Sequence, residues 1–155
     1  MKWNEAIPVE QNARQRLPRL LEKFYAAGRQ VIAHEDPETL HQFRLRGKRV
    51  RYTLELFRPL YGPGLEKLLK ALRNAQTALG EINDCATARG LVPDPRFQSW
   101  IAERQARLRK EFHACWAEEF DAPKKEQQWL RYLRTYARRK RSQPHITGSG
   151  ATARR

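Results

Sequence analysis

The sequence predicts an all-α protein, an antiparallel bundle of about four to five long helices. Apolar residues recur at intervals of three and four through most of the 155 residues, and this is the period of an amphipathic helix. No apolar/polar alternation of convincing length occurs, and no Asn-Gly or Asp-Gly pair marks a hairpin. Short breaks rich in Pro and Gly separate the helical stretches. Long helices joined by short connections are typical of antiparallel neighbours in a bundle.

Turn and capping residues delimit the first two helices. The first is expected over residues 8–33. The second is expected over residues 37–61, because Asp36 can cap its N-terminus and Pro37 suits the first helical position. Gly62, followed by Pro-Gly, ends it.

Three further helices follow the same logic. They are expected over residues 65–89, closed by Gly90, and over 96–120 and 124–141. Three aromatic residues spaced by four on the fourth helix are expected in the core rather than on a stacking platform: Phe112, Trp116 and Phe120.

Composition bounds the organisation of the chain. We expect one helical domain over residues 1–142 and a disordered basic tail over 143–155, where Ser, Gly, Thr and Ala dominate. Two cysteines, Cys85 and Cys115, lie at no metal-ligand spacing, so neither a disulfide framework nor a zinc site is predicted. The N-terminus lacks the apolar run of a signal peptide and no stretch is long and apolar enough to span a membrane. We therefore expect a cytoplasmic protein. We also expect it to bind no cofactor.

The charge balance points to an acidic partner. Lys and Arg number 31 against 17 Asp and Glu, a net charge of +14. Such an excess suits nucleic acid, an anionic membrane surface or a phosphate polymer. A merely basic, solvated surface is the alternative, which the clustering of the charges disfavours.

The second helix concentrates this charge on one side. His41, Arg44, Lys48, Arg51 and Glu55 follow one another at spacings of three, four, three and four, so they lie within about 80° around the helix axis. Residues 41–51 hold five Lys or Arg and no acid. Like charges at these spacings repel one another, which favours the capture of a polyanion. Arg can bind phosphate bidentately and Lys acts as a point charge.

A glycine interrupts the apolar stripe beside this cationic line. Gly47 in mid-helix costs about 0.5–1 kcal/mol relative to alanine. Close approach of another helix would offset the cost, and the alternative is that the cost is simply tolerated.

The third helix offers a second set of polar residues. Lys67, Lys70 and Arg73 add cations near its start, with an ordinary solvated face as the alternative. For the later polar residues, hydrogen bonding between helices is the favoured interpretation. These are Gln76, Asn83 and Asp84.

Two linked motifs carry a family resemblance. Residues 40–57 read L-H-x-x-R-x-x-x-K-x-x-R-Y-x-x-E-x-F, and residues 72–84 read L-x-x-x-Q-x-x-L-G-x-x-N-D. In this order they resemble the CHAD family, the histidine-containing α-helical domain. The resemblance implies a helical bundle that binds inorganic polyphosphate through a basic, histidine-bearing surface, in a family associated with polyphosphate granules.

The resemblance also implies the contact residues. They are His41, Arg44, Lys48 and Arg51, with the third-helix cations as neighbours and Arg49 as a lesser candidate on another side of the helix. The usual CHAD domain contains two related repeats, whereas this chain shows one set of motifs, resembling the second repeat. We therefore expect a homodimer that rebuilds the two-repeat domain.

Two rival functions stay open at this point. Residues 124–141 hold eight basic residues and one acid, interleaved with Trp129, Tyr132 and Tyr136, so nucleic-acid binding is one alternative. The favoured interpretation is that Trp129, Leu133 and Tyr136 pack on the bundle while the arginines face water. The other rival is an enzyme that uses His41 to accept phosphate. No P-loop, paired-metal carboxylate cluster or Ser or Cys nucleophile with a base supports it, so we expect no enzymatic activity.

On the fourth helix, Arg104 and Arg107 are further candidates for extending an anion path.

Overall fold

The computed structural model describes residues 3–138, and within this range it contains five α-helices and no strand. They are α1 (Val9–Ala33), α2 (Pro37–Tyr61), α3 (Leu65–Leu91), α4 (Pro95–Glu119) and α5 (Lys125–Thr135). The predicted all-α bundle is thereby confirmed.

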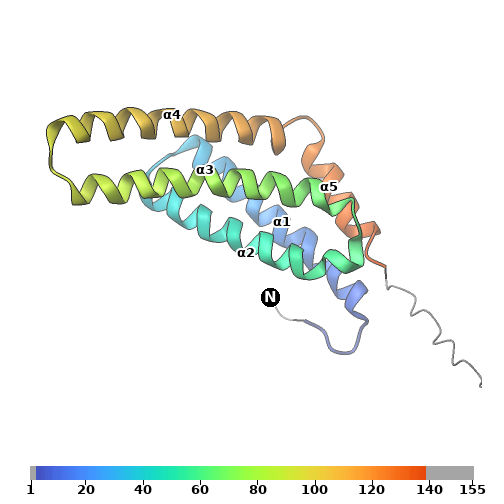
Figure 1. Ribbon diagram of the computed structural model, residues 1–155. Helices are drawn as coiled ribbons and strands as arrows, with labels where there is room; N and C mark the ends of the chain where they lie inside the picture. Colours follow the sequence, from blue (N-terminus) through green and yellow to red (C-terminus); the bar gives the residue numbers. More distant parts are fainter. Residues whose placement is uncertain (1–2, 139–155) are drawn as a thin grey trace, which may run out of the picture.

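The helices pack as neighbours along the chain. α2 lies against α1 and α3, α3 pairs with α4, and α5 returns to pack on α1. α3 and α4 form a long hairpin whose turn projects beyond the other helices (Figure 1). The two sequence motifs, at residues 40–57 and 72–84, therefore lie on helices that pack directly against each other.

An aromatic cluster holds α1, α2 and α4 together. Phe24 stacks on Phe43 with ring centroids 4.9 Å apart, and Trp116 lies 5.7 Å from each of these rings. Phe120 stacks on Trp116 at 5.0 Å. All four side chains are buried, so the core assignment of the α4 aromatics, Phe112 included, is confirmed.

The helix starts follow local chemistry. The Asp36 side chain accepts a hydrogen bond from the Thr39 backbone N–H at 2.9 Å, which is the predicted cap of α2. Asp94 caps α4 in the same way through the N–H of Phe97. Both caps satisfy a backbone donor that the first helical turn leaves unpaired.

Two predicted helix ends are wrong. α3 continues through Gly90 to Leu91, and the extended Val92 ends it because Pro93 disfavours helical backbone before it. α5 stops at Thr135 rather than 141. Beyond it the Arg138 N–H donates to the Leu60 carbonyl at 2.8 Å, one of the last α2 carbonyls that the helix itself leaves free. Residues 139–141 and the predicted tail 143–155 lie outside the described residues.

The interior glycine of α2 has room around it. A Cβ at Gly47 would lie 3.5 Å from Phe24 Cε2 and 3.6 Å from Gln76 Nε2, which are ordinary contact distances. Close helix approach therefore does not require glycine at this position. Of the two interpretations offered by the sequence, the structure favours a tolerated cost.

Candidate functional site

The two sequence motifs face each other across the contact between α2 and α3. Arg51 of α2 donates from Nε to the side-chain oxygen of Gln76 on α3 at 2.8 Å. About two turns toward the start of α2, Arg44 Nε lies 4.0 Å from the position that a Cβ would take at Gly80. The α2 line and the α3 motif thus form the two walls of one surface. Helix-to-helix hydrogen bonding by Gln76 is confirmed.

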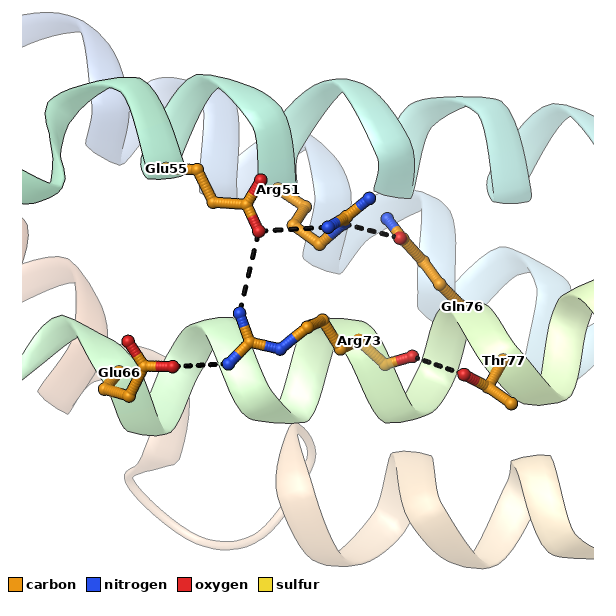
Figure 2. A network of polar contacts seen from close by, with 6 residues as sticks. All are labelled: Arg51, Glu55, Glu66, Arg73, Gln76 and Thr77. Atoms are coloured by element: carbon orange, nitrogen blue, oxygen red, sulfur yellow. Dashed lines mark hydrogen bonds and ion pairs between the residues drawn. The ribbon is translucent and has the colours of Figure 1, made fainter.

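Acidic residues neutralise one end of this surface. Glu55 Oε1 lies 3.0 Å from Arg51 NH1 and 3.6 Å from Arg73 NH1. Arg73 also hydrogen-bonds Glu66, which lies 3.0 Å from Arg58. Figure 2 shows Glu55 bridging arginines of both helices. Arg51 and Arg73 are therefore held in fixed positions by carboxylates, with part of their charge already matched.

The opposite end of the surface carries unmatched charge. No ion pair among residues 3–138 involves Arg44 or Lys48, and both side chains are partly exposed. They share the α2 face with His41, and Arg51 continues this line towards the acids. An anion that reaches this face meets cations that need not first give up a carboxylate partner.

His41 opens into a small cavity at the far end of the surface. The cavity, about 240 Å³, is lined by His41 together with Asn83 and Thr87 of α3 and Arg109 of α4. Its floor is apolar and includes Leu40, Leu79 and Ile82. Sequence reasoning did not single out Arg109 for the site. The rotation of α4 against α3 decides which of its basic residues reaches His41, and no local pattern encodes that rotation.

Arg109 is itself held by an acid from a different element. Its NH1 lies 3.5 Å from Glu35 Oε2, and His113 Nε2 lies 3.4 Å from the same oxygen. Glu35 sits in the turn between α1 and α2. The cavity therefore combines a histidine, a partly matched arginine and neutral hydrogen-bonding groups.

The remaining candidates lie at different distances from this surface. Lys70 is exposed on α3, about 60° around the helix from Arg73 and on the same side, whereas Lys67 is exposed about 120° away. Arg49 lines a separate groove between α1 and α2. The structure thus brings His41, Arg44, Lys48, Arg51 and Arg73 together, leaves Lys70 at the edge, and places Lys67 and Arg49 elsewhere.

The other residues singled out in the sequence add no unmatched charge to this surface. Arg104 pairs with Glu81 at 3.2 Å and Arg107 with Glu111 at 3.9 Å, so neither extends the unmatched charge. The predicted hydrogen bonding between helices by Asn83 and Asp84 is wrong for the described part of the chain. Neither side chain makes such a bond, because Asp84 is exposed and Asn83 lines the His41 cavity. On α5, Leu133 is buried and Trp129 packs against the core, as expected. Tyr136 follows α5 and is half exposed, stacked on Tyr132 at 5.0 Å.

The described residues contain neither a metal-binding cluster nor a membrane-spanning helix. Between residues 3 and 138, no group of three or more His, Cys, Asp or Glu side chains is placed to hold a metal ion. No helix in this range is long and apolar enough to cross a membrane.

Comparison with known proteins decides the family. The CHAD domain matches residues 3–93, which is more than half of the chain and includes both motifs. The protein belongs to the CHAD family. No curated protein and no solved structure matches the chain. The match ends after α3, so α4 and α5 lie outside the recognised CHAD segment. The family is associated with polyphosphate binding.

Proposed function

We propose that this CHAD protein binds inorganic polyphosphate on the surface shared by α2 and α3, without turning it over. The observation that carries the proposal is the position of Arg44 and Lys48. They lie beside His41 between the two motif helices and make no ion pair with any described residue. Membership of a family associated with polyphosphate binding supports the choice of ligand.

The energetics of such a site follow from charge density. Polyphosphate carries closely spaced negative charges, so cationic contacts release condensed counterions, as they do on nucleic-acid backbones. The line from His41 to Arg51 extends about 15 Å along α2, long enough to follow several units of an extended polymer. Glu55 and Glu66 close one end, so the polymer is expected to approach from the His41 end and to end its strong contacts near Arg51.

The central test is a titration with medium-chain polyphosphate at several salt concentrations. The double variant Arg44→Ala, Lys48→Ala should weaken binding at least tenfold and lower the salt slope by about 2, one for each lost phosphate contact. Arg104→Ala, Arg107→Ala removes the same charge from ion-paired positions on α4 and should change little. Equal losses in the two variants would mean that net charge, rather than this surface, determines binding.

DNA is the competitor that separates the proposal from its rival. Nucleic acid uses the same phosphate charge, and the exposed Arg131 of α5 gives it an alternative contact. DNA at equal phosphate concentration should fail to displace polyphosphate. Displacement by DNA would favour the nucleic-acid alternative.

The absence of turnover is a separate part of the proposal. His41 lines a cavity with Asn83, Thr87 and Arg109, groups that can hold a phosphate oxygen by hydrogen bonds. We assign His41 to binding, so His41→Ala should weaken the interaction, and the purified protein should release no phosphate from polyphosphate. Phosphate release that disappears in His41→Ala would instead support the enzyme alternative.

The proposal also includes a homodimer that rebuilds the two-repeat arrangement and associates with polyphosphate granules. Its support is the single motif set in this sequence, together with the gain in basic surface that a symmetric pair provides. Sedimentation at micromolar concentration should show a dimer, and a monomer would contradict this part alone. Co-sedimentation with granules, lost in the Arg44→Ala, Lys48→Ala variant, tests the association.

A further inference from the structure

A second basic groove lies on a different side of α2 from the proposed polyphosphate surface. It runs between α1 and α2 and has a volume of about 560 Å³. Four cations line it and no acid does: Arg16, Arg19 and Lys23 of α1, and Arg49 of α2. Its remaining lining is largely apolar, with Leu20, Leu56, Phe57 and Trp3.

The cations of this groove are unmatched. None of the ion pairs found between residues 3 and 138 includes Arg16, Arg19, Lys23 or Arg49. Arg16 Nε is buried without a hydrogen-bond partner among the described residues. A buried N–H donor that has lost water without gaining a hydrogen-bond partner is unfavourable. The groove therefore gains from an incoming carboxylate or phosphate.

Apolar residues continue from the groove along the outer face of α2. Leu45, Tyr52 and Leu56 are exposed, and their spacing of seven and four places them in line with Arg49. At one end of the groove, Trp3 stacks on Phe57 with ring centroids 5.0 Å apart. Exposed apolar side chains beside a concave, basic floor mark an interaction surface rather than a solvated one.

We propose that this groove binds an amphipathic, acidic helix of a partner protein. Leu45 to Leu56 spans about 17 Å of α2, which matches about three turns of a partner helix laid along the groove. The partner's apolar stripe would pack on Leu56, Leu20 and Phe57, and its carboxylates would face the four cations.

Charge excludes the nearest alternative occupant. Residues 139–155 contain five Lys or Arg and no acid, so this segment is repelled by the groove. An anionic lipid surface shares the charge requirement, but a concave site between two helices suits a rod-shaped ligand better than a flat one.

The inference is tested with a synthetic peptide on the full-length protein. The probe is a fluorescent peptide of about 14 residues with leucines on one helical face and glutamates on the other. Leu56→Ser should weaken its binding about tenfold. The matched control is Leu91→Ser at the end of α3, because Leu56 and Leu91 are equally exposed at 74%. Leu91→Ser should leave the affinity unchanged.

Charge reversal separates specific docking from general attraction. Arg19→Glu with Arg49→Glu should abolish peptide binding, whereas Lys110→Glu with Arg131→Glu, which reverses two exposed cations of α4 and α5, should retain most of it. A peptide of the same composition with its apolar stripe scrambled should bind at least tenfold more weakly. Equal binding of both peptides would overturn the inference, since it would show attraction by net charge.

Further outcomes distinguish this groove from the polyphosphate surface and from other occupants. Arg44→Ala, Lys48→Ala should leave peptide binding intact, so the two proposals can fail independently. The protein could instead bind vesicles of mixed phosphatidylcholine and phosphatidylserine, lose this binding in Leu56→Ser, and fail to bind the peptide. That result would show that the groove contacts a membrane surface rather than a partner helix. A change of sedimentation caused by Leu56→Ser would show that a second copy occupies the groove.

Discussion

The Nε of Arg51 donates a hydrogen bond to the side-chain oxygen of Gln76 at 2.8 Å, and this contact joins the two CHAD motifs across the interface between α2 and α3. Arg51 is also held by Glu55 at 3.0 Å. With two partners, the guanidinium has little freedom to lose when an anion binds. A glutamine within one motif thus positions an arginine of the other.

This relationship predicts coupling between the two side chains in binding. Gln76→Leu should weaken polyphosphate binding about fivefold, equivalent to about 1 kcal/mol, because Arg51 loses its fixed orientation. In the double variant with Arg51→Ala, the loss should not exceed that of Arg51→Ala alone. Titrations of the four proteins of this cycle provide the measurement. Losses that simply add would indicate that Gln76 affects binding only through general stability.

The carboxylate of Glu55 is predicted to restrain binding. It lies between Arg51 and Arg73, so Glu55→Gln frees charge on both arginines and should raise polyphosphate affinity about two- to fivefold, the factor that corresponds to about 0.5–1 kcal/mol. Thermal stability should fall slightly because two ion pairs are lost.

A control of equal charge is available on α4. Glu111→Gln also removes one carboxylate, and its partner Arg107 lies away from the site, 3.9 Å from Glu111. It should leave the affinity unchanged. A similar gain in both variants would show that net charge, rather than the position of Glu55, determines the effect.

Local signals were sufficient to predict most of the fold. Asp36 and the breaks containing Pro and Gly predict helix starts that the structure reproduces within one residue. The predicted end of α5 is wrong because the chain leaves the helix after Thr135 and then forms a tertiary hydrogen bond from Arg138 to Leu60. No pattern within residues 124–141 contains that information.

The site was predictable in outline only. Helical spacing correctly aligned His41, Arg44, Lys48 and Arg51 on one face, since that alignment depends on a single helix. The sequence does not show which of these cations pair with a carboxylate, because the acids come from other helical turns or other helices. Glu66, for example, pairs with Arg73. The entry of Arg109 into the His41 cavity likewise depends on how α4 packs.

Two interior glycines are predicted to respond to alanine in opposite directions. At Gly47 a Cβ has ordinary contact distances, so Gly47→Ala should stabilise the protein by about 0.5–1 kcal/mol. That corresponds to a rise of about 1–4 °C in Tm for a chain of this size. At Gly28 a Cβ would lie 1.9 Å from Cη2 of the buried Trp116, and overpacking of this kind costs about 1–3 kcal/mol. Thermal unfolding followed by circular dichroism gives both values. A Gly28→Ala variant as stable as the parent would contradict the packing of α1 on Trp116.

The ion-pair network at the neutralised end of the site predicts a pH-dependent stability. The hydrogen bond from Arg73, with the nearby charge of Arg58, lowers the pKa of Glu66 below its ordinary value. A carboxyl whose pKa is lower in the folded state stabilises the fold above its unfolded pKa, and this contribution is lost as the pH falls through the folded value. Glu66→Gln should therefore lower the Tm at about pH 7, and its difference in Tm from the parent should be smaller at about pH 3, below the ordinary pKa of a glutamate. Glu103→Gln is the control, because Glu103 is exposed and forms no ion pair within residues 3–138. If the Tm difference caused by Glu66→Gln were the same at both pH values, the Glu66 charge would contribute nothing to stability, and the variant would act through packing alone.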